Sequence, residues 1–319
     1  MISVALCTYN GEKYIEQQIV SIIEQSRSVD EIVICDDGSS DNTLTIISRI
    51  KQNSIVDIRL IETEEKHVGV VRNFQRCCDC CRGDVVFLSD QDDVWYKDKV
   101  KTILDYYDAH PLIDVVFTNA DLIDSEGMKR FSSTLFDHYF TKEDRDIFDR
   151  GEGLACFAKN HATGATMAIR KSFLENNRFA DYKGLGICHD HIIALIAANR
   201  NTIGYINVPL IAYRQHENQT IGIFKLDDGY DAPINEFMLP YLMKASSSDR
   251  LNVWFSAYQF SAWRRGTKHQ LYGPLNIMLH AVKYYRFYGS AFLKMMLYDI
   301  GVSVRHTNKR ISRKVGGAK

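Results

Sequence analysis

The sequence lacks several features that would place it in a simple class of protein. Its 39 basic and 40 acidic side chains nearly cancel, so it has no basic excess of the kind that nucleic-acid-binding proteins carry. Charged residues interrupt every apolar run before it reaches the ~18–20 residues that a membrane-spanning helix needs. No internal repeat and no long low-complexity stretch is present. With an apolar content of 45%, a globular protein is expected.

The N-terminus has neither a basic leader nor a small-residue cleavage site. The chain opens on a strand-like run at residues 2–6, so we expect no signal peptide and a cytoplasmic protein. Its eight cysteines are then expected in a reducing compartment. Cys77, Cys78, Cys80 and Cys81 form two overlapping C-x-x-C pairs, but no second pair stands at the distance that a zinc site usually requires. At helical spacing Cys77 and Cys81 share a face, and we expect these two to pack as small apolar residues.

Strand-like and helix-like segments alternate along the first 120 residues. Short apolar runs bounded by turn residues predict strands at residues 2–7, 31–35, 58–61, 85–88 and 114–117. Apolar residues at helical spacing predict helices from residue 12, around residues 44–50 and over 71–81. Further on, we expect strands at 166–169 and 206–213, a helix opening near residue 189, and a loop or short helices over 131–152. This alternation predicts an α/β fold with a mostly parallel sheet covered on both faces.

The densest polar feature is an acidic stretch directly after the strand at 85–88. Three carboxylates, Asp90, Asp92 and Asp93, fall within four positions. Carboxylates at this density repel one another unless a cation lies among them, and their oxygens suit Mg²⁺ or Mn²⁺. Such a metal commonly takes substrate phosphates as further ligands. The alternative is an acidic turn that caps the next helix, although one cap requires only one Asp.

Two more polar signatures follow predicted strands. Thr8, Tyr9 and Asn10 end the first strand, where an Asn-Gly step suits the positive φ of a tight turn. Asp36 and Asp37 begin a D-D-G-S turn after the second strand. In sheets of this kind ligands bind beyond the carboxyl ends of the strands. We therefore expect these residues and the acidic stretch to converge on one rim.

The order of these motifs resembles the family 2 glycosyltransferases, which have the GT-A nucleotide-sugar-binding fold. The resemblance rests on T-Y-N at 8–10, D-D-G-S at 36–39, R-N at 72–73 and D-Q-D-D at 90–93. Three further stretches resemble the bacterial rhamnosyltransferase-type branch of the family. They are S-D-Q-D-D-V-W at 89–95, H-D at 189–190 and Y-R-Q-H-E-N at 213–218. The likeness implies a glycosyltransferase domain over residues 1–225. Residues 226–319, where aromatic and basic side chains interleave, are expected to form a helical C-terminal extension.

The resemblance implies a set of donor-binding residues, which are Thr8, Tyr9, Asn10, Asp36, Asp37, Arg72, Asp90 and Arg214. Asp37 would accept from the imide N–H of uracil or thymine, and Arg214 would clamp phosphate. Asp92 would bind Mn²⁺ or Mg²⁺ directly, with Asp90 meeting the metal or the ribose and His216 as a third ligand. The cation would offset the charge that builds on the diphosphate as the C1–O bond breaks. A plain Asx turn at Asp36 and Asp37 and a surface role for His216 are the alternatives.

The resemblance also implies a general base, Asp190, at the start of a helix below the acceptor. It would take the proton of the acceptor hydroxyl as that group attacks C1 from the face opposite the diphosphate, which inverts C1. A simple helix N-cap is the alternative. His189 stands where many members of the family have Glu, so its role is left open. The acceptor side would comprise Asp93, Trp95, Gly164, Thr166 and His189.

The leading hypothesis is an inverting, metal-dependent glycosyltransferase that moves L-rhamnose from dTDP-L-rhamnose to a glycan acceptor. The acceptor is expected to be lipid-linked, in the synthesis of a bacterial surface polysaccharide such as O-antigen or capsule. Alternatives are another UDP- or dTDP-hexose donor, a sugar nucleotidyltransferase, and a non-catalytic binding protein. Residues 8–13 match the Gly-rich basic phosphate loop of a nucleotidyltransferase poorly. The aromatic and basic C-terminal third fits either peripheral contact with an anionic membrane or a core with solvated charge.

Overall fold

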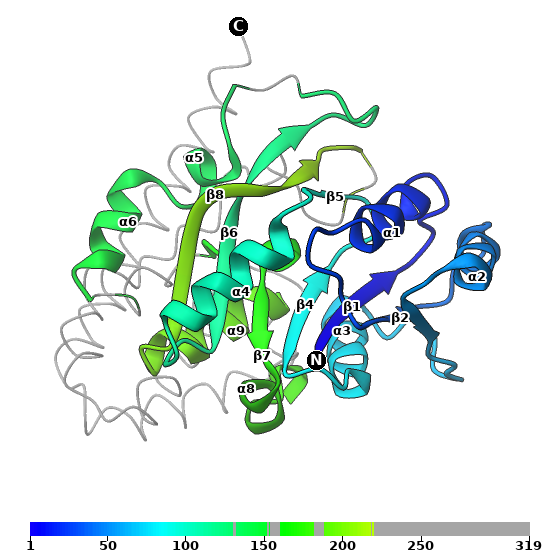
Figure 1. Ribbon diagram of the computed structural model, residues 1–319, viewed down its shortest axis with the longest axis horizontal. Coiled ribbons are helices and arrows are strands. Elements are labelled where there is room, and N and C mark those ends of the chain that lie inside the picture. Colours follow the sequence, from blue (N-terminus) through cyan, green and yellow to red (C-terminus); the bar gives the residue numbers. More distant parts are fainter. Residues whose placement is uncertain (130–131, 152, 154–159, 182–187, 218, 220–319) are drawn as a thin grey trace, which may run out of the picture. The chain divides into compact units, whose positions relative to one another are not determined.

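The computed structural model describes residues 1–129, 132–151, 153, 160–181, 188–217 and 219. This part of the chain is built on one twisted eight-stranded sheet with flanking helices (Figure 1). The predicted helical extension at 226–319 lies outside the described residues. Within them, no helix has both the length and the apolar content needed to cross a membrane.

The sheet has the strand order β3-β2-β1-β4-β7-β6-β8-β5. The strands are β1 (Ile2–Thr8), β2 (Glu31–Asp36), β3 (Asp57–Leu60), β4 (Val85–Ser89), β5 (Val94–Trp95), β6 (Val115–Ile123), β7 (Ala168–Arg170) and β8 (Ile203–Arg214). Four pairs are parallel, namely β1 with β2, β1 with β4, β2 with β3, and β6 with β8. β7 runs antiparallel to both of its neighbours, and β5 runs antiparallel to β8. The expected mostly parallel sheet is confirmed, with β7 as an antiparallel seam between the parallel set β3-β2-β1-β4 and the parallel pair β6-β8.

Helices connect these strands. They are α1 (Ile15–Ile23), α2 (Thr43–Asn53), α3 (Val70–Cys80), α4 (Lys99–Ala109), α5 (Leu135–Tyr139), α6 (Lys142–Asp149), α8 (Lys171–Asn176) and α9 (His189–Asn199). The short helices expected within 131–152 are α5 and α6, and each begins with a capping box, at Thr134 and Thr141. The strand expected at 166–169 begins later, because residues Gly164–Thr166 form a 3₁₀ turn before β7.

Strands β1, β2 and β4 in the first half of the sheet are buried on both faces. Side chains of a strand point alternately to the two faces, and almost every residue of β1, β2 and β4 is buried. On the helical side, α3 packs against β1 and β2 and also contacts α8 and α9. Every residue of α9 is buried, as expected for a helix that is surrounded by protein. Cys77 and Cys81 are buried on or beside α3, as predicted, and Cys78 is buried as well.

A buried carboxylate anchors the start of β2. Glu31 has no exposed surface, and it accepts hydrogen bonds from Ser3 Oγ at 2.6 Å, Arg82 N at 2.6 Å and Arg59 Nη1 at 2.8 Å. Burial alone would raise the pKa of Glu31, but these hydrogen bonds outweigh it and lower the pKa below its ordinary value. The ionised form of Glu31 therefore stabilises the folded state.

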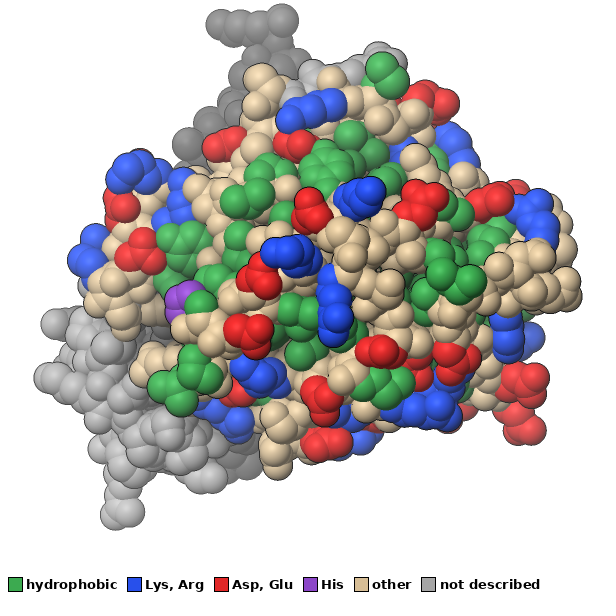
Figure 2. All heavy atoms as spheres, in the orientation of Figure 1, with side chains coloured by type: hydrophobic (Ala, Val, Ile, Leu, Met, Phe, Trp, Pro, Cys, Tyr) green, Lys and Arg blue, Asp and Glu red, His purple; other side chains and the backbone are tan. Residues whose placement is uncertain are grey.

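Charge is evenly mixed over the face that Figure 2 shows. Basic and acidic side chains alternate there with apolar and neutral ones, and neither sign gathers into an extended patch. This face therefore carries no field of one sign of the kind that a nucleic-acid surface requires.

Candidate active site

The first two polar loops meet at the carboxyl ends of β1 and β2. Thr8 Oγ1 donates to Asp36 Oδ2 at 2.7 Å, as expected from their opposed positions in the two strands. The backbone N–H of Asn10 donates to Ser39 Oγ at 2.8 Å, and the N–H of Ser40 donates to Asn10 Oδ1 at 2.9 Å. These bonds join two loops that lie about 30 residues apart in the chain.

The acidic stretch joins the same rim. The side-chain amide of Gln91 exchanges two hydrogen bonds with the backbone of Tyr9, accepting from its N–H at 2.9 Å and donating to its carbonyl at 3.0 Å. The three signatures therefore converge, as predicted from the rule that parallel strands end at one edge.

The carboxylates of the second loop are used by protein groups. Asp36 Oδ1 accepts from the N–H groups of Gly38 and Ser39 at 2.9 and 2.7 Å, which is an Asx-type turn. Asp37 accepts from the N–H groups of Val68 and Gly69 at 2.8 and 2.9 Å. Asp37 thus fixes the loop that leads into α3.

That loop carries His67, which the sequence analysis does not single out. The rings of Tyr9 and His67 lie edge to face with centroids 5.6 Å apart, and 49% of Tyr9 is exposed. An exposed aromatic ring beside a loop held by Asp37 is a surface on which a planar base can stack. Arg72 is exposed on α3, and in the described residues it makes no hydrogen bond or ion pair, so its donor-binding role stays a prediction.

Carboxylates crowd together around the acidic loop. Asp90 is partly buried, and the negative charges of Asp92 and Asp190 repel its carboxylate. Burial and this repulsion together raise the pKa of Asp90 to about 7. Asp93 is buried, and burial followed by repulsion from Asp92 and Asp90 raises its pKa well above the ordinary value. Its Oδ2 has no hydrogen-bond partner among the described residues, whereas Oδ1 accepts from Arg214 N at 3.0 Å. An arrangement of this kind has a deficit of positive charge.

One buried cation partly offsets that deficit, and sequence reasoning missed it. Lys99 has no exposed surface; its ammonium donates to the carbonyl of Ala165 at 2.8 Å and lies 3.9 Å from the centre of the Trp95 ring. Burial lowers the pKa of Lys99 to about 7, although Asp93 and Asp90 oppose the shift. No pattern distinguishes a buried lysine at a helix start from a solvated one, so the sequence carries no signal for it.

Asp92 and His216 form the candidate metal-binding pair. Asp92 Oδ2 lies 2.7 Å from His216 Nε2, and the exposed fractions of the two side chains are 15% and 12%. No third His, Cys, Asp or Glu joins them among the residues that the structure describes. One carboxylate and one imidazole, beside acidic groups whose charge Lys99 offsets only in part, fit a divalent ion that takes its other ligands from phosphate or water.

Arg214 is buried and supports the acidic loop. Its guanidinium donates to the carbonyls of Asp92 at 2.7 Å and Asp124 at 3.2 Å and to Gln17 Oε1 at 2.7 Å. It also lies 4.5 Å from the centre of the Tyr14 ring. A phosphate contact would require Arg214 to leave these acceptors, so the phosphate clamp expected from the sequence stays a prediction.

Asp190 lies in the first turn of α9, after the N-cap residue Cys188, so it is not the N-cap. Its Oδ2 accepts from Gly164 N at 3.1 Å, and its Oδ1 accepts from Asn160 Nδ2 at 3.1 Å. Since its charge also acts on Asp90, the predicted base and the predicted metal loop lie in one site.

The residues predicted for the acceptor side are buried. Exposed fractions are 5% or less for Asp93, Trp95, Thr166 and His189, and Gly164 is also buried. Trp95 packs in the core against Phe87, and His189 stacks on Phe74 with centroids 4.1 Å apart. A Cβ at Gly164 would lie 2.8 Å from His189 Nε2, so glycine is needed there for close packing of the protein itself. Direct contact of these five residues with an acceptor stays a prediction.

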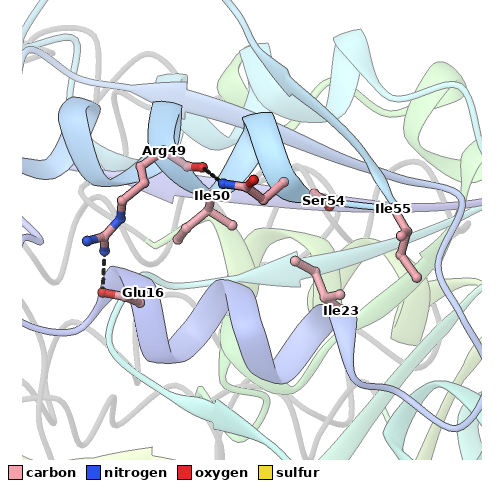
Figure 3. A pocket seen from close by; sticks show the side chains of 7 residues that line it. Glu16, Ile23, Arg49, Ile50, Ser54 and Ile55 are labelled. Carbon is pink, nitrogen blue, oxygen red and sulfur yellow. Dashed lines mark hydrogen bonds and ion pairs between the residues drawn. The ribbon is translucent and has the colours of Figure 1, made fainter.

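A separate open groove lies between α1 and α2 (Figure 3). Its lining residues are Glu16, Ile23, Arg49, Ile50, Asn53, Ser54 and Ile55. An ion pair of 2.6 Å between Arg49 and Glu16 spans it. None of the predicted site residues lines this groove, so it is not part of the acidic site.

The chain is similar to known proteins over most of its described part. Residues 3–178 match the family described as Glycosyl transferase family 2. The dTDP-rhamnosyl transferase RfbG of Shigella flexneri is 35% identical over 225 residues, which cover 68% of this chain and 73% of that protein. An uncharacterized glycosyltransferase of Haemophilus influenzae is 24% identical over 225 residues, covering 70% of this chain and 68% of that protein.

Among solved structures, residues 1–349 of Staphylococcus aureus TarS in complex with UDP-GlcNAc resemble this fold with a TM-score of 0.54. The identity is 17%, and the match covers 91% of this chain and 81% of that chain. At this identity the likeness bears on the fold.

Proposed function

The chain belongs to glycosyl transferase family 2 and has its GT-A fold, and on that premise we propose that it transfers L-rhamnose from dTDP-L-rhamnose to a glycan. The activity of the family is glycosyl transfer. The alternative of a sugar nucleotidyltransferase, which the sequence left open, is therefore set aside. Rhamnose as the donor sugar is supported by the 35% identity with the Shigella dTDP-rhamnosyl transferase. Another UDP- or dTDP-hexose is the competing donor.

The observation that carries the proposal is the meeting of Asp92, His216 and Asp190 in one acidic site. Asp92 and His216 would hold Mn²⁺ or Mg²⁺, and the bound ion would supply positive charge for the departing diphosphate. Asp90 links the proposed metal site to the proposed general base, since the charges of both Asp92 and Asp190 act on its carboxylate.

The nucleoside would lie at the rim formed by the first two loops. Tyr9 offers an exposed ring for stacking, and Asp37 orders the neighbouring loop through the N–H groups of Val68 and Gly69. Thr8, Asn10 and Asp36 hold the two loops against each other through their hydrogen bonds.

Asp190 would act as the general base. Its carboxylate accepts from Gly164 N, Asn160 Nδ2 and His191 N, and these three donors hold it in place. Oδ2 accepts from Gly164 N alone among the described residues, which leaves it a lone pair for the acceptor hydroxyl. Removing that proton as the oxygen attacks C1 gives a single displacement with inversion. General-base assistance of this kind typically contributes ~10²–10⁴ in rate.

The acceptor in this proposal is a lipid-linked glycan of a bacterial surface polysaccharide, and the enzyme works at the cytoplasmic face of the membrane. The aromatic and basic residues after position 226 would contact anionic lipid. Sedimentation with vesicles that contain 30% anionic lipid tests this, compared between the full chain and a variant that ends before Arg305. Equal partitioning of the two proteins contradicts the membrane contact of the tail.

The donor is identified by thermal shift in the presence of Mn²⁺, with dTDP-L-rhamnose, dTDP-glucose, UDP-glucose and UDP-GlcNAc compared at equal concentrations. A ligand that binds only the folded protein raises its melting temperature by mass action. We expect the largest shift with dTDP-L-rhamnose and a loss of that shift with chelator. A larger shift with another sugar nucleotide rejects rhamnose, and no shift with any of them rejects the proposed function.

A further inference from the structure

Gln91 stands in the middle of the D-Q-D sequence, between the two carboxylates of the acidic loop. Its amide forms two hydrogen bonds with one backbone unit, accepting from Tyr9 N at 2.9 Å and donating to Tyr9 O at 3.0 Å. A residue that is paired on both its N–H and its C=O is fixed in position and orientation, much as in a strand ladder. Among the described contacts, this pairing ties the acidic loop directly to the loop after β1.

Gly11 provides the space for this pairing. A Cβ at Gly11 would lie 2.3 Å from Gln91 Oε1 and 2.6 Å from its Cδ. The positive φ of the Asn-Gly step belongs to Asn10, at 49°, and Gly11 has no positive φ. The glycine is thus required by the close approach of the Gln91 amide, which corrects the conformational reason expected from the sequence.

The other side of the same loop is anchored to helices. Gly11 N donates to Thr43 Oγ1 at 2.8 Å, and Gly11 O accepts from the N–H groups of Tyr14 and Ile15 at 3.0 Å where α1 begins. The pairing of β1 with β4 fixes the bases of the two loops, and beyond the strand ends Gln91 joins Tyr9 to the acidic loop.

We propose that Gln91 is a positioning residue that holds the nucleoside-binding ring of Tyr9 at a fixed distance from the metal-binding carboxylate of Asp92. The inference rests on the proposed function, in which one donor molecule spans both. A rigid link between two subsites favours a ligand that fills both, because no ordering of one loop against the other is required on binding. The link contributes little to a ligand that fills only one subsite.

The test uses titration calorimetry on the full chain with dTDP and with thymidine, each in the presence of Mg²⁺. Gln91→Ala is expected to weaken dTDP binding about 10-fold, since two hydrogen bonds are lost, and to change thymidine binding less than about 2-fold. Gln52→Ala on the exposed face of α2 is the matched control and should bind as the wild type does. In steady-state assays the KM for the donor should rise while kcat changes little, because Asp190 is untouched.

Gly11→Ala supplies an independent arm. In the wild-type background its methyl group displaces the Gln91 amide, so dTDP binding should weaken as in Gln91→Ala. In the Gln91→Ala background the clashing atoms are gone, and the same methyl group should cost almost nothing. The two changes are therefore expected to be strongly non-additive, as is usual for residues in contact.

The outcomes separate this inference from the proposed function. If the wild-type protein binds no dTDP with Mg²⁺, the proposed function fails. If the wild type binds but Gln91→Ala binds dTDP within about 2-fold of it, the positioning role is rejected. Independent, additive losses from Gly11→Ala and Gln91→Ala also reject it, and so does an equal loss of thymidine and dTDP binding. Melting temperatures measured alongside show that each variant is folded.

Discussion

His216 Nε2 lies 2.7 Å from Asp92 Oδ2, although 124 residues separate the two in the chain. One follows β4 and the other follows β8, and both lie with the first two loops at the carboxyl ends of their strands. A carboxylate and an imidazole in this position compete for the same space as a bound cation, so a metal ion would replace their mutual contact.

The first prediction concerns Asp92. Asp92→Ala should lower glycosyl transfer by about 10²–10³-fold or more, because the cation that offsets the leaving-group charge loses its carboxylate ligand. Initial rates are measured while Mg²⁺ or Mn²⁺ is varied. Asp105→Ala removes a carboxylate that is 62% exposed on α4 and should leave the rate unchanged. Undiminished transfer by Asp92→Ala in the presence of chelator would contradict the metal role.

A second prediction concerns His216. His216→Asn should increase the metal concentration needed for half-maximal rate by about 10–100-fold, since one ligand is lost while Asp92 remains. The rate at saturating metal should recover much of the wild-type value. His138, on the short helix α5, provides the control, and His138→Asn should leave the metal requirement unchanged. The same metal requirement in His216→Asn and the wild type would show that His216 is not a ligand.

The third prediction tests the base. Asp190→Asn keeps the size of the side chain and an oxygen that can accept from Gly164 N, but it removes proton-accepting ability. We expect kcat to fall ~10²–10⁴-fold while the Kd for the nucleoside diphosphate stays within about 2-fold. Binding is measured by calorimetry and turnover by release of nucleotide. Turnover at the wild-type rate would rule out Asp190 as the base.

The fourth prediction uses the lowered pKa of Glu31. A carboxyl group whose pKa is lower in the folded than in the unfolded chain stabilises the fold above the unfolded value of about 4.5, and that contribution is lost as the pH falls through the folded value. Glu31→Gln should therefore reduce the free energy of unfolding by about 1–3 kcal/mol at pH 7. The difference from the wild type should shrink as the pH falls below about 4.5.

Urea denaturation at pH 7 and at pH 4 measures this difference. Glu16→Gln is the control, because Glu16 forms its ion pair with Arg49 at the surface, with 57% of its side chain exposed. Such a pair contributes at most about 1 kcal/mol. A Glu31→Gln deficit that is constant over this pH range would mean that ionisation of Glu31 does not stabilise the fold.

The sequence predicts the first half of the sheet well because its strands are buried apolar runs bounded by turn residues. β1, β2, β3 and β4 lie within a residue or two of the expected positions. The two-residue strand β5 is too short to show a period, and α4 begins with Lys99, a residue that looks solvated in the sequence. The antiparallel direction of β7 depends on tertiary pairing that no local pattern records.

The candidate site likewise has a part that the sequence predicts and a part that it does not. Convergence of the polar loops follows from the rule on strand ends, so Thr8, Asp36 and Asp92 could be placed on one rim in advance. The burial of charged residues could not be predicted, because Lys99 and Arg214 are buried only through long-range partners such as Ala165 and Gln17. Charged side chains are mostly exposed, and a prediction made from that tendency fails at a buried polar network.

The antiparallel strand β7 separates two parts of the predicted site, which suggests a junction for chimeric enzymes. The loops predicted to bind the nucleoside follow the strands on one side of β7, whereas the strand that leads to His216 belongs to the other side, and the helix that carries Asp190 contacts β6 and β8 there. A chimera that takes residues 1–93 from this protein, and so keeps Gln91 paired with Tyr9, and the remainder from a relative with a different acceptor should keep the predicted nucleoside-binding loops together. Its product should change in the sugar that is extended, not in the nucleotide that is consumed.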